Sequence, residues 1–547
     1  FGRLSTRADH DCAPESTTMQ AVPQDPHVVA GVIATLRRLL GEQHVLTDHA
    51  EREFYSQDVY RAGQLPAAVI RPGSVEELAA ALQAIAPAGL PLVPRGGGMS
   101  YTDGFLPAQH DSITLDLLRL DRVLEINPDD CYVTVECGAT WKRLCDALEP
   151  HGVRTPYYGP LSGLYATIGG ALSQGSVFLG SGRYGTAADS VIGLDVMLAD
   201  GSILKLGSHA NRNGQPFFRQ VGPDTMAMFL SDSGSLGIKL RASFRLVRPQ
   251  RESRNLSFCF DTAAQLFGAL GEVAREDVAS EQFAIDPALQ AVRLKRVSLR
   301  EDARALGQLV KGTGGLKGLV EGAKVVMAGR GFLEEGKFSA HVSLDGRDAV
   351  DADAKAAIVR RVMGSFGGAE VENTVPKMMR ANPFAEVNNM LGPGGERWVP
   401  VHGTVPFSEA TKMWQACEAV FARHAAAMTA HGITHGYLSS TVGQVGTLVE
   451  PVLFWPDARL AFHERVLDAA YLAKLPKHPP NPPAAAAVAR LREDLATAFM
   501  QAGAVSFQLG KFYRYQDGLE PTAAAFLKQL KQLVDPQGRM NPGGLGL

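Results

Sequence analysis

Three consecutive glycines, Gly96–Gly98, follow a short apolar run and an arginine in the sequence PLVPRGGGMSYTDG (Pro91–Gly104). Glycine has no side chain to cover the backbone N–H groups, and it tolerates positive φ. Such a loop can fold into a concave nest of amides that binds an anion, with the Arg95 guanidinium adding positive charge nearby. For this fragment alone, a mobile glycine loop without a ligand is the alternative interpretation.

A second glycine-rich stretch runs from Gly159 to Gly185 and contains a literal G-x-G-x-x-G at Gly180, Gly182 and Gly185. A Rossmann dinucleotide site needs a strand before that string and a helix after it. The flanking residues 176–179 and 186–189 are too few and too polar to form these elements. The string therefore does not favour a Rossmann fold.

Composition excludes several classes of function. The chain has 547 residues, a net charge of −3 and 20% charged residues, which describes an ordinary globular protein rather than a nucleic-acid binder. No apolar run approaches the roughly 20 residues that cross a bilayer, so we expect no membrane span and a cytoplasmic location. The six cysteines form no C-x-x-C pair, so we expect reduced thiols and no structural metal.

The order of predicted elements divides the chain. We expect residues 1–24 to be a disordered N-terminal extension. Residues 25–250 alternate short strands with helices; one helix begins at Pro26 behind the Asp25 cap, and another spans Trp141–Leu148. A hairpin is predicted near residues 191–206.

The next part, residues 251–489, is predicted to be a second unit. It contains helices over Ala263–Ala274 and Val350–Met363 and a long helix capped by Ser408, with strands between them, as in an antiparallel α+β unit. The proline-rich segment Lys477–Pro483 is predicted to be a stiff linker. Residues 490–547 form a last segment that ends in a helix over Thr522–Val534.

Seven motifs occur in an order that is similar to one family. They are RGGG at 95–98, P-x-S-G-x-x-A-T-I-G-G at 160–170, RYG at 183–185, D-x-V-x-G-L-D-V-M-L-A-D-G at 189–201, GPD at 222–224, SGSLGIKLRASFRL at 233–246 and DPQGRMNPGG at 535–544. Together they resemble the FAD-linked oxidoreductases of the vanillyl-alcohol oxidase and para-cresol methylhydroxylase type. The resemblance covers residues 60–248 and 495–547 and is weak between them.

The resemblance implies an α+β fold with a two-part FAD-binding domain, residues 25–250 and 490–547, and an antiparallel α+β cap over residues 251–489 that holds the substrate. Glycine-loop N–H groups suit the FAD pyrophosphate. The implied FAD-binding residues are Pro94, Arg95, Gly96, Gly97, Gly98, Met99, Ser100, Pro160, Ser162, Gly163, Thr167, Ile168, Gly169, Gly170, Gly175, Tyr184, Gly185, Gly237, Ile238 and Asn541.

Met99 bears on how FAD is attached. Several family members attach the flavin through a histidine just after the glycines, and Met99 stands at that place here. A thioether cannot make the 8α-histidyl bond. We therefore expect non-covalent FAD, with a covalent link elsewhere in the cap as the open alternative.

The catalytic residues are predicted less directly. Tyr513-Arg514 resembles the Tyr-Arg pair with which phenol-oxidising members hold a phenolate, since a guanidinium and a hydroxyl both stabilise developing negative charge. Pro160-Leu161-Ser162 lacks the carboxylate that those enzymes place there, which weakens the alkylphenol interpretation. A purely structural pairing of Tyr513 and Arg514 is the alternative.

Histidines supply the candidate base. His402 lies in a turn defined by glycine and proline, and histidine titrates near neutral pH. His431 and His435 have the i, i+4 spacing of a metal pair, but no glutamate lies between them and Gly432 interrupts the helix. We expect no metal.

The sequence thus predicts an FAD-dependent oxidoreductase that transfers hydride from a small hydroxylated molecule, a para-substituted phenol or an alcohol or 2-hydroxy acid, to flavin N5. The alternatives are a flavoprotein subunit that passes electrons to a cytochrome or other partner, and a flavin-binding protein without turnover. The expected partners are a small-molecule substrate and an unspecified electron acceptor, with a homodimer as a candidate assembly.

Overall fold

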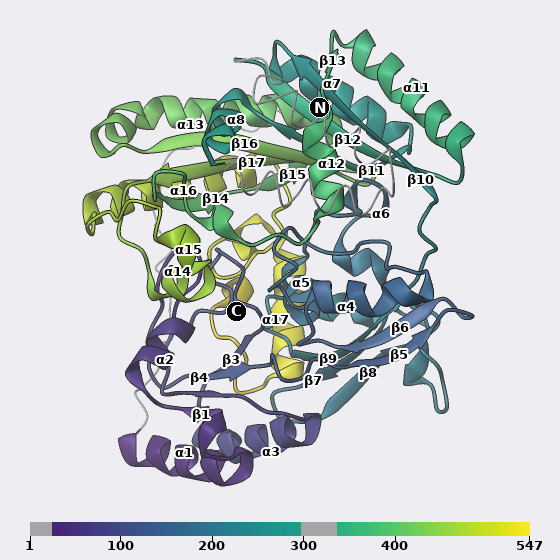
Figure 1. Cartoon of the computed structure of the whole chain (residues 1–547). Helices are drawn as coiled ribbons and strands as arrows, with labels where there is room; N and C mark the ends of the chain where they lie inside the picture. Colours follow the sequence, from purple (N-terminus) through teal and green to yellow (C-terminus); the bar gives the residue numbers. More distant parts are fainter. Residues whose placement is uncertain (1–24, 297–335) are drawn as a thin grey trace, which may run out of the picture.

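The computed structural model describes residues 25–296 and 336–547. The expected disorder of residues 1–24 lies outside this part of the chain. Three sheets organise the described residues, and Figure 1 shows the largest of them in the upper half of the view with the two smaller sheets below. We call the two smaller sheets with their helices the first unit, and the large sheet with its helices the second unit.

A four-stranded sheet carries the glycine loop. Its order is β1 (Val45–Leu46), β2 (Ala68–Ile70), β4 (Ile113–Asp116) and β3 (Leu92–Arg95). β2 and β3 both pair with β4 in parallel. Helices α1 (Pro26–Leu40), α2 (His49–Tyr55) and α3 (Val75–Ile85) accompany it. The predicted cap Asp25 accepts a backbone N–H group at the start of α1, and Ser74 does the same for α3.

A five-stranded antiparallel sheet completes the first unit. Its order is β5 (Val123–Asn127), β6 (Tyr132–Glu136), β9 (Ile238–Arg245), β7 (Val191–Met197) and β8 (Ile203–Gly207). The β7–β8 pairing confirms the predicted hairpin. Helix α4 spans Trp141–Leu148 as predicted, because Thr140 caps it and Trp141, Leu144 and Leu148 share a buried face. Short helices α5 (Ile168–Gln174) and α6 (Ser181–Tyr184) follow it.

The second unit contains an eight-stranded sheet. Its order is β13 (Ala369–Val371), β10 (Glu252–Phe260), β12 (Phe338–Gly346), β11 (Ala279–Ile285), β16 (Thr434–Val442), β17 (Gly446–Trp455) and β14 (Arg397–Pro400), and β15 (Gly403–Val405) also pairs with β17. All the pairings of its described strands are antiparallel. The predicted antiparallel α+β arrangement is confirmed.

Helices cover the outer face of this sheet, away from the first unit (Figure 1). They are α7 (Ala263–Arg275), α11 (Ala349–Ser365) and α13 (Ala410–His431), which share one apolar core with the sheet and with α16 (Pro482–Gln501). Among the shorter helices, α8 (Pro287–Arg296) contacts β16, and α12 (Thr374–Ala381) contacts β10 and β12. Helices α14 (Ala461–Val466) and α15 (Ala469–Leu472) follow β17 in the chain, and α17 (Pro521–Val534) returns to the first unit.

Two local predictions are wrong. Ser408 does not cap α13, because residues 407–409 already form a 3-10 turn and the helix begins at Ala410 without a side-chain cap. The predicted linker Lys477–Pro483 ends inside α16, since Asn481 caps that helix and Pro482 begins it. Over residues 25–296 and 336–547, no helix combines the length and apolarity that a membrane crossing requires.

Candidate functional site

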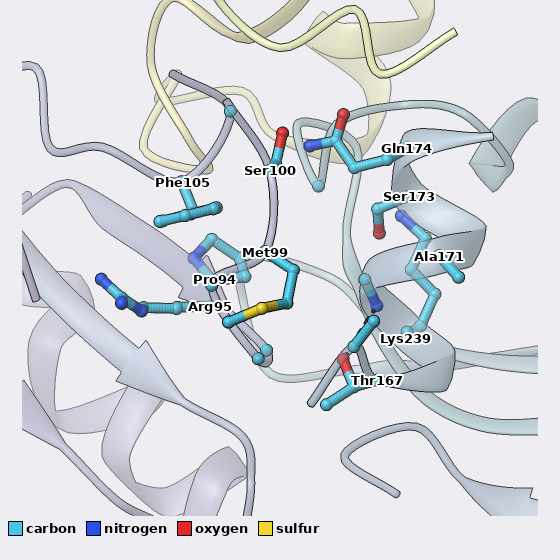
Figure 2. A pocket seen from close by; sticks show the side chains of 18 of the residues that line it. Pro94, Arg95, Met99, Ser100, Phe105, Thr167, Ala171, Ser173, Gln174 and Lys239 are labelled. Atoms are coloured by element: carbon cyan, nitrogen blue, oxygen red, sulfur yellow. Dashed lines mark hydrogen bonds between the residues drawn. The ribbon is translucent and has the colours of Figure 1, made fainter. Parts of the chain in front are cut away.

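A pocket opens where three loops of the first unit meet (Figure 2). The end of β3 and the loop after it supply Pro94–Ser100. The segment around the start of α5 supplies Pro160, Ser162 and most of residues 166–174. The segment that leads into β9 supplies part of residues 233–239. Gln508, from the segment between α16 and α17, also lines it. The sequence motifs quoted above therefore converge on one cavity.

Two of the loops pack so closely that only glycine fits between them. A Cβ built on Gly97 would overlap the Tyr165 carbonyl, and one built on Gly96 would overlap Thr167 Oγ1. Gly98 has a φ of +71°, in the left-handed region that glycine favours. The glycines are thus required first of all by the contact between the loops.

The same geometry leaves backbone donors for a ligand. Within the described residues, the N–H groups of Gly97, Gly98 and Met99 donate no hydrogen bond. None of the residues lining the pocket is acidic, and Lys239 and Arg95 are cationic. The buried Oε1 of Gln174 also lacks a hydrogen-bond partner among the described residues. A pocket of amide donors without carboxylates suits a diphosphate-bearing group.

The sequence predicts that Arg95 adds positive charge beside a bound anion, but its guanidinium contacts backbone carbonyls at the end of α2 instead. Its guanidinium donates to the carbonyls of Tyr55 (2.9 Å) and Gln57 (3.2 Å), and it lies 4.7 Å from the Phe105 ring centroid. Burial lowers its pKa to about 10. Figure 2 shows this side chain directed away from Thr167 and Lys239. Arg95 therefore ties the glycine loop to the end of α2.

Most of the predicted FAD-binding residues line the pocket. They are Pro94, Arg95, Gly96, Gly97, Gly98, Met99, Ser100, Pro160, Ser162, Thr167, Gly169, Gly170, Gly237 and Ile238. Thr167 caps α5 by accepting the Gly170 N–H at 3.2 Å. This bond fixes the start of the helix at the pocket wall.

The remaining predicted residues lie outside the lining. Ile168 is part of the apolar core, and Gly163 packs against Phe384. Gly175, Tyr184 and Gly185 form the ends of α5 and α6. Asn541 is buried and its Nδ2 donates to the carbonyls of Gly104 (2.7 Å) and Ser233 (2.6 Å), so that it joins two of the pocket loops.

Lys239, Gln174 and Gln508 line the pocket but were missed in the sequence. Lys239 is buried and paired with Asp232, which also accepts the Gly234 N–H at 2.9 Å. Lys239 directly follows the predicted pocket residues Gly237 and Ile238, and this position is the signal that could have identified it. Gln508 had no such signal, since it reaches the pocket from a segment far away in sequence.

Gln508 connects this pocket to a buried polar cluster. Its Nε2 donates to the Tyr101 hydroxyl at 3.1 Å, and it has a positive φ of 52°. The Tyr101 ring contacts Trp398 (5.6 Å between centroids) and His402 (6.1 Å), both from the second unit. The cluster thus lies between the pocket and the large sheet.

His402 is the best-defined member of the cluster. It is fully buried, its ring stacks on Phe507, and its Nε2 hydrogen-bonds to the Phe507 carbonyl. Its Nδ1 lies 3.8 Å from a carboxylate oxygen of Glu450 and has no hydrogen-bond partner among the described residues. Burial lowers the pKa of His402 to about 4, so the imidazole is neutral at pH 7.

Tyr513 and Arg514 both line a second pocket beside the end of α16, but their side chains have different partners. The Tyr513 hydroxyl accepts the His402 backbone N–H at 2.8 Å, which places it at the cluster. The Arg514 side chain is 67% exposed and pairs with Asp517 at 2.7 Å. The predicted Tyr-Arg pair is therefore not formed, because neighbouring side chains point in different directions here.

His431 and His435 do not lie on one helix face, as their i, i+4 spacing would require in a helix. α13 ends at His431, and His435 lies on β16 with its ring stacked on Phe421. Residues 25–296 and 336–547 contain no group of three His, Cys, Asp or Glu side chains placed to hold a metal ion.

Comparison with known proteins agrees with this geometry. Residues 66–207 match the FAD binding domain family, and residues 511–545 match the C-terminal domain of FAD linked oxidases. The glycolate oxidase subunit GlcD of Bacillus subtilis is 30% identical over 42% of this chain and 48% of its own length. The mitochondrial cytochrome-type D-lactate dehydrogenase of Arabidopsis thaliana is 30% identical over 41% of this chain and 38% of its own length. The chain thus spans less than half the length of these relatives.

The solved structure of p-cresol methylhydroxylase with substrate bound superposes with a TM-score of 0.71 at 18% identity, over 96% of this chain and 98% of that one. The chain therefore shares the fold of p-cresol methylhydroxylase, and the part that matches the FAD binding domain family contains most of the pocket loops. Two parts of the chain, residues 66–207 and 511–545, are thus similar to the two domains of FAD-linked oxidases.

Proposed function

We propose that this protein is an FAD-dependent oxidoreductase that removes hydride from a small hydroxylated substrate bound between the glycine-lined pocket and the large sheet. In this proposal residues 25–250 and 490–547 bind FAD, and residues 251–489 form the substrate cap. The bond from Gln508 to Tyr101 carries the proposal, because Gln508 lines the FAD pocket while Tyr101 contacts the second unit.

His402 is the proposed proton acceptor. Because its Nε2 faces a carbonyl oxygen, the favoured tautomer carries the proton on Nε2 and leaves the Nδ1 lone pair open. Nδ1 then faces a carboxylate oxygen of Glu450, which is a second acceptor, at 3.8 Å. In the proposal, a substrate hydroxyl donates its hydrogen bond to His402 Nδ1, which has no partner among the described residues.

Each of these groups has a separate role in the proposed oxidation of an alcohol. When bound, FAD supplies an acceptor for the hydride of the substrate C–H bond. His402 Nδ1 takes the hydroxyl proton, so the C–O single bond becomes a carbonyl. Tyr101 and Gln508 orient the substrate, and the neighbouring apolar rings exclude water.

Non-covalent attachment is part of the proposal. Met99 lines the pocket at the position where family members carry a histidine, and Figure 2 shows its thioether among the lining side chains. The names of the relatives, glycolate oxidase and D-lactate dehydrogenase, favour 2-hydroxy acids as the first substrates to test.

Anaerobic mixing of the FAD-loaded protein with 2-hydroxy acids and para-substituted phenols tests the proposal. We expect one class to bleach the flavin absorption, and His402→Gln to slow bleaching at least about 100-fold, within the range for a lost acid–base group. The matched control is His424→Gln, because His424 lies on α13 and pairs with Asp494 on α16. The flavin of this variant should be bleached at the wild-type rate. Equal rates for His402→Gln and wild type would remove His402 from the chemistry.

A further inference from the structure

The end of α12 and the residues that follow it, 379–386, contact one of the pocket loops although they belong to the second unit. We call this segment the strap and residues 158–165 the FAD loop. Figure 1 shows α12 at the junction between the large sheet and the part of the molecule that contains α4 and α5. Three side chains of the strap contact the FAD loop at three points along its length.

Phe384 provides the central contact. Its ring is buried in the apolar core of the first unit, beside α4 and the five-stranded sheet. A Cβ built on Gly159 would lie 2.7 Å from Phe384 Cε1, and one built on Gly163 would overlap the same ring. The lack of a side chain at these two loop glycines therefore makes room for the Phe384 ring of the second unit.

Arg380 provides the contact at the start of the loop. Its guanidinium bonds to both carboxylate oxygens of Glu281 (2.9 and 2.7 Å) and to the Tyr158 hydroxyl (3.3 Å). The Tyr158 hydroxyl itself donates to Glu281 at 2.8 Å. Asp345 pairs with both Arg380 and Arg154, so two guanidinium groups balance the two carboxylates of this buried cluster.

Glu386 provides the contact at the end of the loop. Its carboxylate accepts the Tyr165 hydroxyl at 2.6 Å. The carbonyl of the same Tyr165 packs on Gly97 of the glycine loop. Pro160 and Ser162, between the three contacts, line the FAD pocket directly.

We propose that Arg380, Phe384 and Glu386 are positioning residues that hold the FAD loop in its binding conformation, so that FAD affinity depends on the docking of the second unit. The strap side chains do not line the pocket, and they act through residues that do. By linkage, bound FAD strengthens the docking of the strap to the same degree. The inference depends on FAD binding at this pocket and is independent of the substrate chemistry.

Titration of the flavin-free full-length protein with FAD, followed by flavin fluorescence, measures the effect. We expect Phe384→Ala to raise the Kd about 30-fold, equivalent to about 2 kcal/mol. Phe366→Ala is the matched control, because the Phe366 ring also packs on a glycine, Gly268, but within the second unit. It should destabilise the flavin-free protein comparably and leave the Kd unchanged, while Phe384→Leu should restore most of the affinity.

Tyr165→Phe provides a second variant that removes only a hydroxyl at an exposed contact. We expect it to weaken FAD binding about fivefold, the size of one ordinary hydrogen bond, because the contact is exposed to solvent. Wild-type affinity in both Phe384→Ala and Tyr165→Phe would overturn the proposal. Equal loss of affinity in Phe384→Ala and Phe366→Ala would also overturn it, because the effect would then follow general stability. Failure of the wild type to bind FAD would instead contradict the proposed function.

Discussion

The carbonyl oxygen of Tyr165 occupies the space in which a side chain on Gly97 would begin. Two loops that lie about seventy residues apart in the sequence therefore meet at a contact that admits no Cβ. This contact places the Gly97 N–H at the pocket and the Tyr165 hydroxyl at the strap. The FAD site and the second unit are joined through these two residues.

Gly97→Ala should sharply reduce FAD binding. The added methyl group must displace the Tyr165 backbone, and overpacking of this kind costs about 1–3 kcal/mol, so we expect the Kd to rise about 30-fold. The matched control is Gly31→Ala on α1, where a Cβ meets nothing within 4 Å. Gly31→Ala should bind FAD normally and unfold at a slightly higher urea concentration. Normal FAD occupancy in Gly97→Ala would refute the placement of the loop contact.

Gln508→Ala should separate FAD binding from turnover. The substitution removes the donor to the Tyr101 hydroxyl, and the loss of one such bond corresponds to about tenfold in kcat/KM. FAD affinity should change less, because the glycine-loop amides and Lys239 remain. Stopped-flow reduction and FAD titration of the same preparation measure the two effects. A larger loss of FAD affinity than of kcat/KM would assign Gln508 to the cofactor alone.

His402 should make the protein sensitive to mild acid. Burial lowers its pKa from 6.5 to about 4, so the unfolded chain takes up a proton near pH 6.5 while the folded protein does not until about pH 4. Stability should therefore fall by about 3 kcal/mol as the pH decreases through this window. Urea unfolding at several pH values measures it. The free energy of unfolding of His402→Gln should decrease less than that of the wild type as the pH falls. An equal decrease in both proteins would show that His402 is not responsible.

Tyr513 and Arg514 should respond differently to substitution. Tyr513→Phe leaves the buried His402 N–H without its acceptor, which costs about 1–3 kcal/mol of stability. Arg514→Ala removes an exposed ion pair with Asp517 that contributes at most about 1 kcal/mol. Urea unfolding and substrate-driven flavin reduction compare the two. A reduction rate in Arg514→Ala that falls more than tenfold would restore the Tyr-Arg pair as a substrate clamp.

Local elements were predictable where a cap and an apolar face agree. Thr140 and the buried face of Trp141, Leu144 and Leu148 define α4 in the sequence as in the structure. The motif order also predicted which loops line the pocket, because the glycines mark places where backbones approach closely. Both signals are local in the chain.

Side-chain direction was not predictable. Arg95 follows the strand that leads to the glycine loop, yet its guanidinium is held by carbonyls at the end of α2. Arg514 follows Tyr513, yet it points to solvent. Gln508 bonds to Tyr101, and Phe384 packs on Gly159 and Gly163. Each contact joins segments more than two hundred residues apart, and no local sequence pattern encodes such contacts.

The flavin content of the purified protein and its reduction by substrate test whether this protein is an FAD-dependent oxidoreductase. The protein is reconstituted with FAD, freed of excess, reduced anaerobically with the substrate panel, and then precipitated with acid. We expect one FAD per protein chain, and one substrate class should bleach its absorption. Acid should then release intact FAD, because Met99 cannot form a histidyl link. A protein that takes up no FAD, or whose flavin is bleached by none of these hydroxylated compounds, would contradict it.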